Sequence, residues 1–246
     1  LLFGFAGVAL WGIQMLWIPF WAAGVINGIG HWWGYRNFET PDASRNISWL
    51  GVLVGGEELH NNHHAFASSA KFSNRWWEFD LGWGYIRVLQ SLRLAKVKKL
   101  APTAHIVTGK ERVDMDTLRA VFANRLNVMS NYAREVVLPV LRQEYGCCDG
   151  ACRKRLRQAR RLLVRNPRIM DENSRGVLDG VLERFANLRT VYQYREHLQG
   201  IWNRSAASHE QLLQALQDWC QQAEATGVQA LQDFARRLKG YSLQPA

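Results

Sequence analysis

Three histidines stand within five residues in the stretch HNNHH, which runs from His60 to His64, and a fourth, His31, lies upstream in NGIGHWW. Neutral imidazole is a ligand that suits iron, copper, nickel and zinc. Clustered imidazoles without a metal would repel one another when protonated and would lack partners when buried. The cluster therefore predicts a transition-metal site.

The spacing within HNNHH predicts how a helix would present these ligands. His60 lies three residues before His63 and four before His64, so all three side chains lie on one helical face. His63 and His64 are neighbours and diverge by about 100°, so one short helix can supply ligands to two metal ions. The other three histidines stand alone in polar surroundings, and we interpret them as ordinary residues: His105, His197 and His209.

The element that precedes this cluster is a long uncharged run. No Asp, Glu, Lys or Arg occurs between Leu1 and Gly30, and the first charged residue is Arg36. Because roughly 20 apolar residues span a bilayer, the sequence predicts a transmembrane segment over residues 1–30. A basic start and a small-residue cleavage site, which mark a secretory signal, are missing. Gly12 and Pro19 interrupt the run, so one continuous helix and two helices joined by a turn both fit.

All 31 Lys and Arg residues and all 21 Asp and Glu residues follow this run, and the net charge is +10. The positive-inside tendency places the histidine cluster and the remainder of the chain in the cytoplasm. The cysteines fit that reducing compartment, where disulfides are not expected. Three of them form CCDGAC, whose spacing matches no familiar zinc pattern, so we interpret Cys147, Cys148 and Cys152 as ordinary thiols in a turn.

HNNHH follows GGE and precedes WWEFDLGW, and upstream an N-x3-H element stands before GYRNFETPD. This arrangement resembles the membrane fatty acid desaturases of the acyl-CoA type, over residues 1 to about 100. The resemblance implies a centre of two non-haem iron ions, ligated by His31, His60, His63 and His64, with Asn27 holding a water beside it. Glu57 and Glu58 are candidate acceptors for an imidazole N–H, and Glu57 aligns with a glutamate of the family. Alternatively, Glu57 and Glu58 simply cap the ligand helix.

The first two histidine boxes of that family, HxxxxH and HxxHH, do not occur in this chain. We therefore expect the chain to be the carboxy-terminal part of a longer protein, and we assign the activity to the complete protein. That activity would be the oxygen-dependent insertion of a cis double bond into a saturated fatty acyl chain. Two alternatives remain: a fatty acyl hydroxylase on the same scaffold, and a non-catalytic, membrane-anchored basic interaction module.

The resemblance also implies partners and a location. The substrate would be a fatty acyl chain carried as a coenzyme A thioester or in a phospholipid, and the electrons would come from a separate donor such as ferredoxin and its reductase. The complete protein would cross the bacterial inner membrane several times. The aromatic stretch WWEFDLGWGYIRVLQSLRL, which contains Trp76 and Trp83, is typical of a segment that lies on the bilayer surface.

Residues 101–246 form a second region with amphipathic helical patterns, so the predicted fold class is all-α. It comprises membrane helical segments, a cytosolic helical cap that carries the histidine box, and a soluble helical extension. Ser208 and Gln211 predict a capping box and a helix from about 209 to 224. Extensions of this kind follow the catalytic region in some bacterial desaturases.

The stretch from Arg153 to Arg168 contains eight basic residues and no acidic residue. Such a helix suits anionic lipid or nucleic acid, or is simply solvated, and in an anchored chain we favour a membrane surface or partner over nucleic acid. The end of the chain, AEATGVQALQDFARRLKGY, also resembles a helical stretch of some transposases. Because the sequence shows no acidic catalytic triad for transposition, we expect no nucleic-acid partner.

Overall fold

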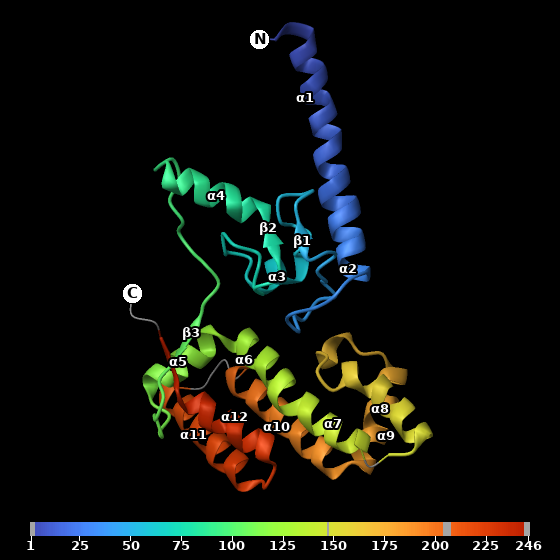
Figure 1. Ribbon diagram of the computed structural model, residues 1–246, viewed down its shortest axis with the longest axis vertical. Helices are drawn as coiled ribbons and strands as arrows, with labels where there is room; N and C mark the ends of the chain where they lie inside the picture. Colours follow the sequence, from blue (N-terminus) through green and yellow to red (C-terminus); the bar gives the residue numbers. More distant parts are fainter. Residues whose placement is uncertain (1–2, 147, 204–207, 244–246) are drawn as a thin grey trace. The chain divides into compact units, whose positions relative to one another are not determined.

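The computed structural model describes residues 3–146, 148–203 and 208–243. The protein is mostly helical, as predicted, and it consists of two compact units (Figure 1). Unit 1 is Leu1–Ala101 and unit 2 is Pro102–Ala246. The two units have very different interiors: that of unit 1 is largely polar, and that of unit 2 is a hydrophobic core.

Unit 1 begins with one continuous helical run, Gly4–Trp32, which is long and apolar enough to cross a membrane. It consists of α1 (Gly4–Pro19), the π-helix η1 (Phe20–Ile29) and α2 (Gly30–Trp32). Pro19 cannot donate a backbone hydrogen bond and its ring crowds the preceding turn. The wider π-helical turns begin directly after Pro19, so the helix continues instead of breaking. Of the two arrangements that fitted the sequence, the single helix is the one observed.

The remainder of unit 1 contains short elements joined by structured loops. Strands β1 (Leu50–Gly51) and β2 (Phe79–Asp80) pair in parallel, with Leu50 opposite Phe79. The predicted histidine-box helix is α3 (His60–Ala65). Helix α4 (Leu81–Ser91) follows β2 and begins where the Asp80 carboxylate accepts a hydrogen bond from the Trp83 N–H. No residue of α4 is buried.

Unit 2 is a helical bundle with one small antiparallel sheet, β3 (Ala104–Ile106) with β4 (Tyr241–Leu243). The other elements are α5 (Met115–Ala123), α6 (Arg125–Tyr132), the π-helix η2 (Ala133–Val137), α7 (Leu138–Gly146), α8 (Gly150–Leu162), the 3-10 helix η3 (Pro167–Ile169), α9 (Glu172–Arg184), α10 (Ala186–Trp202), α11 (His209–Ala225) and α12 (Gln229–Lys239). The predicted helix at 209–224 is thus confirmed as α11. Ser208 and Gln211 form its predicted capping box.

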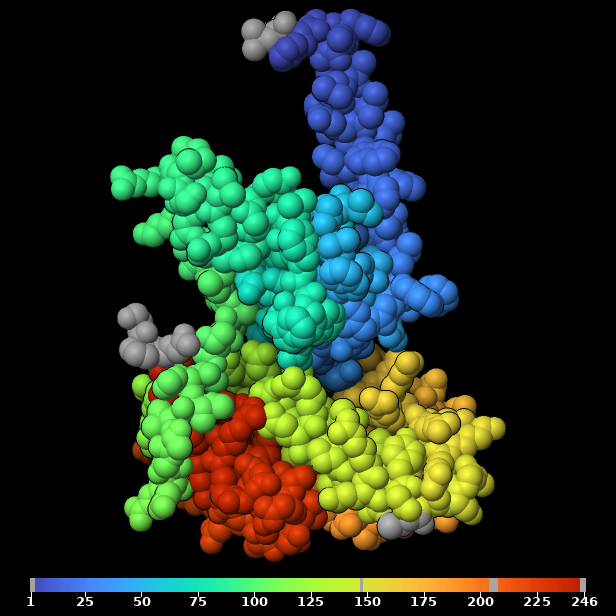
Figure 2. Space-filling view, viewed as in Figure 1, coloured from blue at the N-terminus to red at the C-terminus, as the bar shows by residue number. Residues whose placement is uncertain are grey.

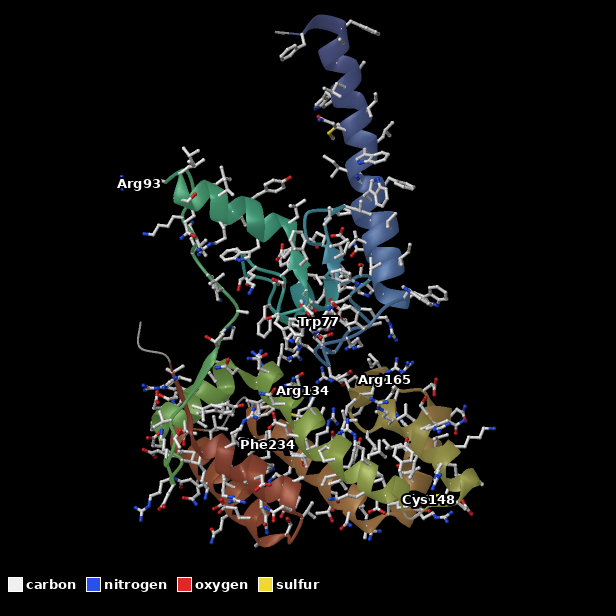
Figure 3. The ribbon with its side chains drawn as sticks, viewed as in Figure 1. Trp77, Arg93, Arg134, Cys148, Arg165 and Phe234 are labelled. Atoms are coloured by element: carbon white, nitrogen blue, oxygen red, sulfur yellow. A yellow bond between two sulfur atoms is a disulfide. The ribbon has the colours of Figure 1, made fainter. Side chains whose placement is uncertain are left out.

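An aromatic cluster lies at the centre of the unit 2 core. Phe234, which is labelled in Figure 3, belongs to this cluster. Its ring centroid lies 5.0 Å from that of Tyr132 and 6.2 Å from that of Trp219. The polar atoms of the cluster are satisfied, since Tyr132 donates to the Val191 carbonyl at 2.6 Å and Trp219 donates to the Tyr194 carbonyl at 3.0 Å. Burial therefore leaves no unpaired donor in this cluster.

The cysteines differ from the sequence expectation in one respect. Cys148 and Cys152 form a disulfide, whereas we expected free thiols. Cys148 directly precedes Asp149, which caps α8, and Cys152 lies in the first turn of that helix. This arrangement brings the two Cα atoms to 5.6 Å, within the range that a disulfide requires. Cys147 lies outside the described residues. Cys220 is a buried free thiol, and burial raises its pKa to about 12.

Candidate metal centre

Three of the four predicted histidine ligands come together in unit 1. His31 extends from α2, and His60 and His64 extend from α3, so that one possible ligand atom of each lies within 4.8 Å of the others. The Nε2 atoms of His31 and His60 are 3.1 Å apart. Two imidazole nitrogens that bind one ion at about 2 Å lie about 3 Å from each other, so this separation suits a shared metal ion.

His60 has the properties of a ligand held in the neutral state. Its side chain is buried, and its Nδ1 atom has no hydrogen-bond partner among the described residues. Burial, and after it the positive charges that His64, His31 and His63 can carry, lowers the pKa of His60 to about 4. A metal ion needs the unprotonated imidazole, so the environment of His60 fits metal binding.

Asp42 orients His64. Its carboxylate Oδ2 lies 2.9 Å from the Nδ1 atom of His64, so Nδ1 donates the hydrogen bond and Nε2 remains available for a metal. Asp42 is itself fixed by the Thr40 hydroxyl at 2.8 Å and by the Ser44 backbone N–H at 2.9 Å. Burial raises the pKa of Asp42, but the hydrogen bonds from Ser44, His64 and Thr40 lower it well below its usual range. This carboxylate belongs to the NFETPD motif, and the sequence pattern alone assigns it no role.

His63 lies apart from the other three ligand candidates. Its ring centroid is 6.4 Å from that of His60 and 4.8 Å from that of Phe72. Its Nδ1 atom is also buried without a partner among the described residues. The structure therefore separates HNNHH into His60 and His64, which face His31, and His63, which faces a different direction. This divergence is what the 100° step of a helix predicts.

Gly30 allows α2 to approach the box closely. A Cβ atom at this position would lie 3.0 Å from Cδ2 and 3.3 Å from Cγ of His60. Any larger residue would therefore have to displace the imidazole. The glycine in NGIGH is a signal that the sequence analysis did not use.

The two asparagines of the box anchor α3 on its opposite side. The Asn61 Oδ1 atom accepts the backbone N–H groups of Asn37 and Phe38, each at 2.9 Å. Asn62 donates to the Glu78 carboxylate at 2.8 Å, and its Oδ1 atom accepts from the Asn37 amide, also at 2.8 Å. These bonds fix the rotation of the helix, so that the histidines face the candidate metal centre.

Glu78 is the centre of this polar network. It is buried, and its carboxylate accepts from Tyr35, Asn37, Asn62 and the backbone N–H groups of Asn74 and Arg75, at distances between 2.6 and 2.9 Å. A buried carboxylate is tolerated only when such donors surround it. Glu78 belongs to WWEFDLGW, which carries part of the family resemblance, but the sequence pattern alone assigns Glu78 no role.

The remaining predicted site residues lie as follows. Asn27 is exposed on η1, one turn before His31. Glu58 is buried and accepts the backbone N–H groups of Val52, Leu53, Val54 and Gly56, so it organises the preceding loop. Glu57 is half-buried, and its role beside an imidazole stays a prediction.

Comparison with known proteins finds a family model that matches more than half of the chain. A family model described as transposase matches residues 94–244. From the sequence we gave little weight to the transposase resemblance at the end of the chain, and this match corrects that view. In the described parts of unit 2, no three residues of the His, Cys, Asp and Glu types lie close enough to hold an ion together.

The chain is also similar to curated relatives that are named desaturases. The chain is 43% identical over 94 residues to the sn-2 palmitoyl-lipid 9-desaturase of Nostoc sp. (strain 36), which covers 38% of this chain and 32% of the relative. It is 47% identical over 76 residues to the Delta-9 acyl-lipid desaturase 1 of Arabidopsis thaliana, covering 31% and 25%. The sn-1 stearoyl-lipid 9-desaturase of Anabaena variabilis is 43% identical over 94 residues, covering 37% and 34%.

The chain thus spans about a third or less of the length of these relatives. No solved structure matches it. The matched stretches of 94 residues are close to unit 1 in length, and the transposase match begins only at residue 94.

Proposed function

Through residues 94–244 the chain belongs to the transposase family, and we propose that its unit 1 is the carboxy-terminal part of a fatty acyl desaturase. The resemblance to acyl-lipid 9-desaturases extends over a stretch about as long as unit 1. The complete enzyme would insert a cis double bond into a saturated acyl chain. The observation that carries this proposal is the convergence of His31, His60 and His64 from two separate helices.

The residues of this chain would hold part of a centre of two non-haem iron ions. His31, His60 and His64 fit one ion, and the diverging His63 fits the second. Bound iron would supply the oxidising power, taken from dioxygen, that removal of hydrogen from an unactivated methylene requires. Asp42 would keep the proton of His64 on Nδ1, and the buried Asn61, Asn62 and Glu78 would keep α3 fixed. As the family resemblance implies, Asn27 would hold a water beside the centre, and Glu57 would accept a hydrogen bond from an imidazole N–H.

The substrate that we propose is an acyl chain esterified in a membrane lipid. The three relatives named above are described as acyl-lipid, palmitoyl-lipid and stearoyl-lipid desaturases, whereas the sequence alone left coenzyme A thioester and phospholipid open. The helical run Gly4–Trp32 would place unit 1 in the bilayer where such substrates reside. We further propose a separate electron donor, such as ferredoxin with its reductase, and a bacterial inner membrane with the histidines on the cytoplasmic side.

The test is to express the complete reading frame that encodes these residues in a host lacking acyl-lipid 9-desaturase. Mass spectrometry would locate new double bonds in the lipid acyl chains, and metal analysis would count iron. His64→Ala removes a proposed ligand, and His105→Ala is the matched control, because His105 lies on β3 in unit 2. We expect a new cis double bond that persists in His105→Ala and disappears in His64→Ala.

Other outcomes would change the assignment in defined ways. Hydroxylated acyl chains would identify the hydroxylase alternative. Bound iron without any product, in the presence of an electron donor, would contradict the proposed substrate. Absence of bound iron would contradict the metal site itself.

A further inference from the structure

Helix α4 of unit 1 carries an apolar face that is exposed. Four of its apolar residues lie within an arc of about 100°, and we call them the apolar face: Leu81, Tyr85, Val88 and Leu89. Tyr85 is 62% exposed and Val88 is 57% exposed. The polar residues Arg87 and Gln90 lie on the opposite side of the helix, each about 150° from the centre of this face. Figure 2 shows α4, in blue-green, at the surface.

The turn that follows β1 is a second exposed apolar feature of the same unit. It comprises residues 52–56, and its Leu53 side chain is 82% exposed. Because β1 and β2 are parallel, this turn and α4 both begin at the same end of the strand pair. A Cβ atom at Gly82 would lie only 2.1 Å from the Gly55 carbonyl oxygen, so the turn contacts the start of α4. Gly82 lies about 20° from Leu89 around the helix, so the turn adjoins the apolar face.

The buried Glu58 carboxylate pairs the backbone donors of this turn. Its Oε1 atom accepts the N–H groups of Val52, Leu53 and Val54 at 3.0, 2.5 and 3.0 Å, and its Oε2 atom accepts that of Gly56 at 3.2 Å. At an aqueous surface, water would bind such donors. In an apolar environment, an unpaired N–H costs free energy. Glu58 therefore allows the turn to leave water with these four donors paired.

Several features of unit 1 indicate that a bilayer is this environment. The unit carries the helical run Gly4–Trp32, which is long and apolar enough to cross a membrane, and no residue of α1 is buried. In Figure 1 the turn and α4 lie on the side of unit 1 toward which α1 extends. The exposed Trp49, just before β1, is of a residue type that concentrates at the membrane–water interface. An apolar face opposite a side that carries Arg87 is typical of a helix that lies in this interface.

We propose that the turn and the apolar face of α4 together enter the interfacial region of the bilayer, with Glu58 as the positioning residue of the turn. From the sequence we expected only the aromatic stretch 76–94 at a bilayer surface, and the turn had no role. Unit 1 would thus contact the membrane at a second place besides Gly4–Trp32, which would fix the orientation of the histidine site relative to the bilayer. This inference rests on the membrane location proposed above.

The test uses the full chain in phosphatidylcholine nanodiscs. The photoreactive p-benzoylphenylalanine replaces Leu53, Val88 or Gln90, one position in each variant. Gln90 is the matched control, because it is exposed on the same helix but lies opposite the apolar face. After illumination, mass spectrometry measures the fraction of each variant that carries a lipid adduct. We expect several-fold more adduct from positions 53 and 88 than from position 90.

Glu58→Gln tests the positioning role. The glutamine amide keeps the size of the side chain but replaces one acceptor oxygen with a donor, so it cannot accept all four N–H groups. We expect the adduct from position 53 to fall several-fold and hydrogen exchange of the turn to become faster. The adduct from position 88 should persist, which shows that unit 1 is still folded. Glu210→Gln removes the same charge at an exposed position of α11 and should change neither adduct.

Retention of the chain in the nanodiscs during gel filtration separates the two levels of the proposal. A chain that is not retained would overturn the proposed membrane location, and this inference with it. A retained chain in which positions 53 and 88 give no more lipid adduct than position 90 would overturn this inference alone. Cross-links from positions 53 and 88 to a second copy of the chain, in place of lipid, would show that protein covers the surface. An unchanged adduct from position 53 in Glu58→Gln would contradict the role of Glu58.

Discussion

At the scale of single residues, there is little free space between the His60 imidazole and α2. A methyl group at Gly30 would lie 3.0 Å from the imidazole, whereas a methyl group at Gly28 would meet nothing within 4 Å. Both glycines lie in the same helical run, so alanine raises the helix propensity at each position by a similar amount. The two substitutions therefore differ mainly in their effect on His60.

We predict that Gly30→Ala weakens metal binding by about tenfold, because the displaced imidazole would no longer reach an ion held by His31 and His64. Gly28→Ala should bind as tightly as the unchanged chain. Titration with Co²⁺, followed by its ligand-field absorption, measures the affinity. Equal affinities for the two variants would show that His60 is not a ligand in this position.

The carboxylate of Asp42 gives a second prediction at this scale. Asp42→Asn keeps the size of the side chain but removes the charge that holds the Nδ1 proton of His64. We expect metal affinity to fall between about tenfold and a hundredfold, with an unchanged circular dichroism spectrum. Asp116→Asn removes the same charge in unit 2 and serves as the control. An unchanged affinity in Asp42→Asn would contradict the orienting role of Asp42.

At the scale of elements, α3 is too short to be stable by its own backbone hydrogen bonds. The buried amides of Asn61 and Asn62 attach it to the loop around Asn37 and to Glu78 instead. Within HNNHH, the two anchoring asparagines thus lie between candidate ligands, His60 on one side and His63 and His64 on the other. This explains why Asn61 and Asn62, which are not candidate ligands, are nonetheless buried completely.

Asn62→Ala should therefore destabilise unit 1 by about 2 kcal/mol or more, because the half-buried Asn37 and the buried Asn46 each lose an acceptor, and Glu78 loses a buried donor. Guanidinium unfolding, followed by tryptophan fluorescence, measures the loss, since most tryptophans of the chain lie in unit 1. Gln90→Ala on the exposed side of α4 is the control. Equal stability of the two variants would mean that the network around Glu78 does not anchor α3.

The sequence predicted the elements that depend on local patterns. The apolar run, the histidine-box helix, the α11 capping box and the basic α8 each follow from spacing within a few residues. The spacing also predicted that His63 would diverge from His64. The roles of Asp42 and Glu78 could not be predicted in this way, because they depend on contacts between residues that lie 16 or more positions apart.

At the scale of the whole molecule, the two units keep separate interiors. All residues of the large hydrophobic core lie between Val113 and Tyr241, within unit 2, whereas the buried polar network and the histidines lie within unit 1. Units with their own interiors can unfold separately. The transposase match begins near the boundary between the two units, at residue 94.

Separate interiors predict separate responses to mutation. Leu216 is fully buried in the core of unit 2, and Leu216→Ala should cost about 3 kcal/mol in the unfolding of that unit, because it leaves a cavity. Metal affinity at His31, His60 and His64 should not change. Leu94→Ala removes the same atoms from a side chain that is 73% exposed, so it should affect neither property. Hydrogen exchange resolves the stability of each unit, and Co²⁺ titration measures the affinity. Weaker metal binding in Leu216→Ala would show that unit 2 supports the geometry of the histidine site, and the desaturase proposal would then have to include both units.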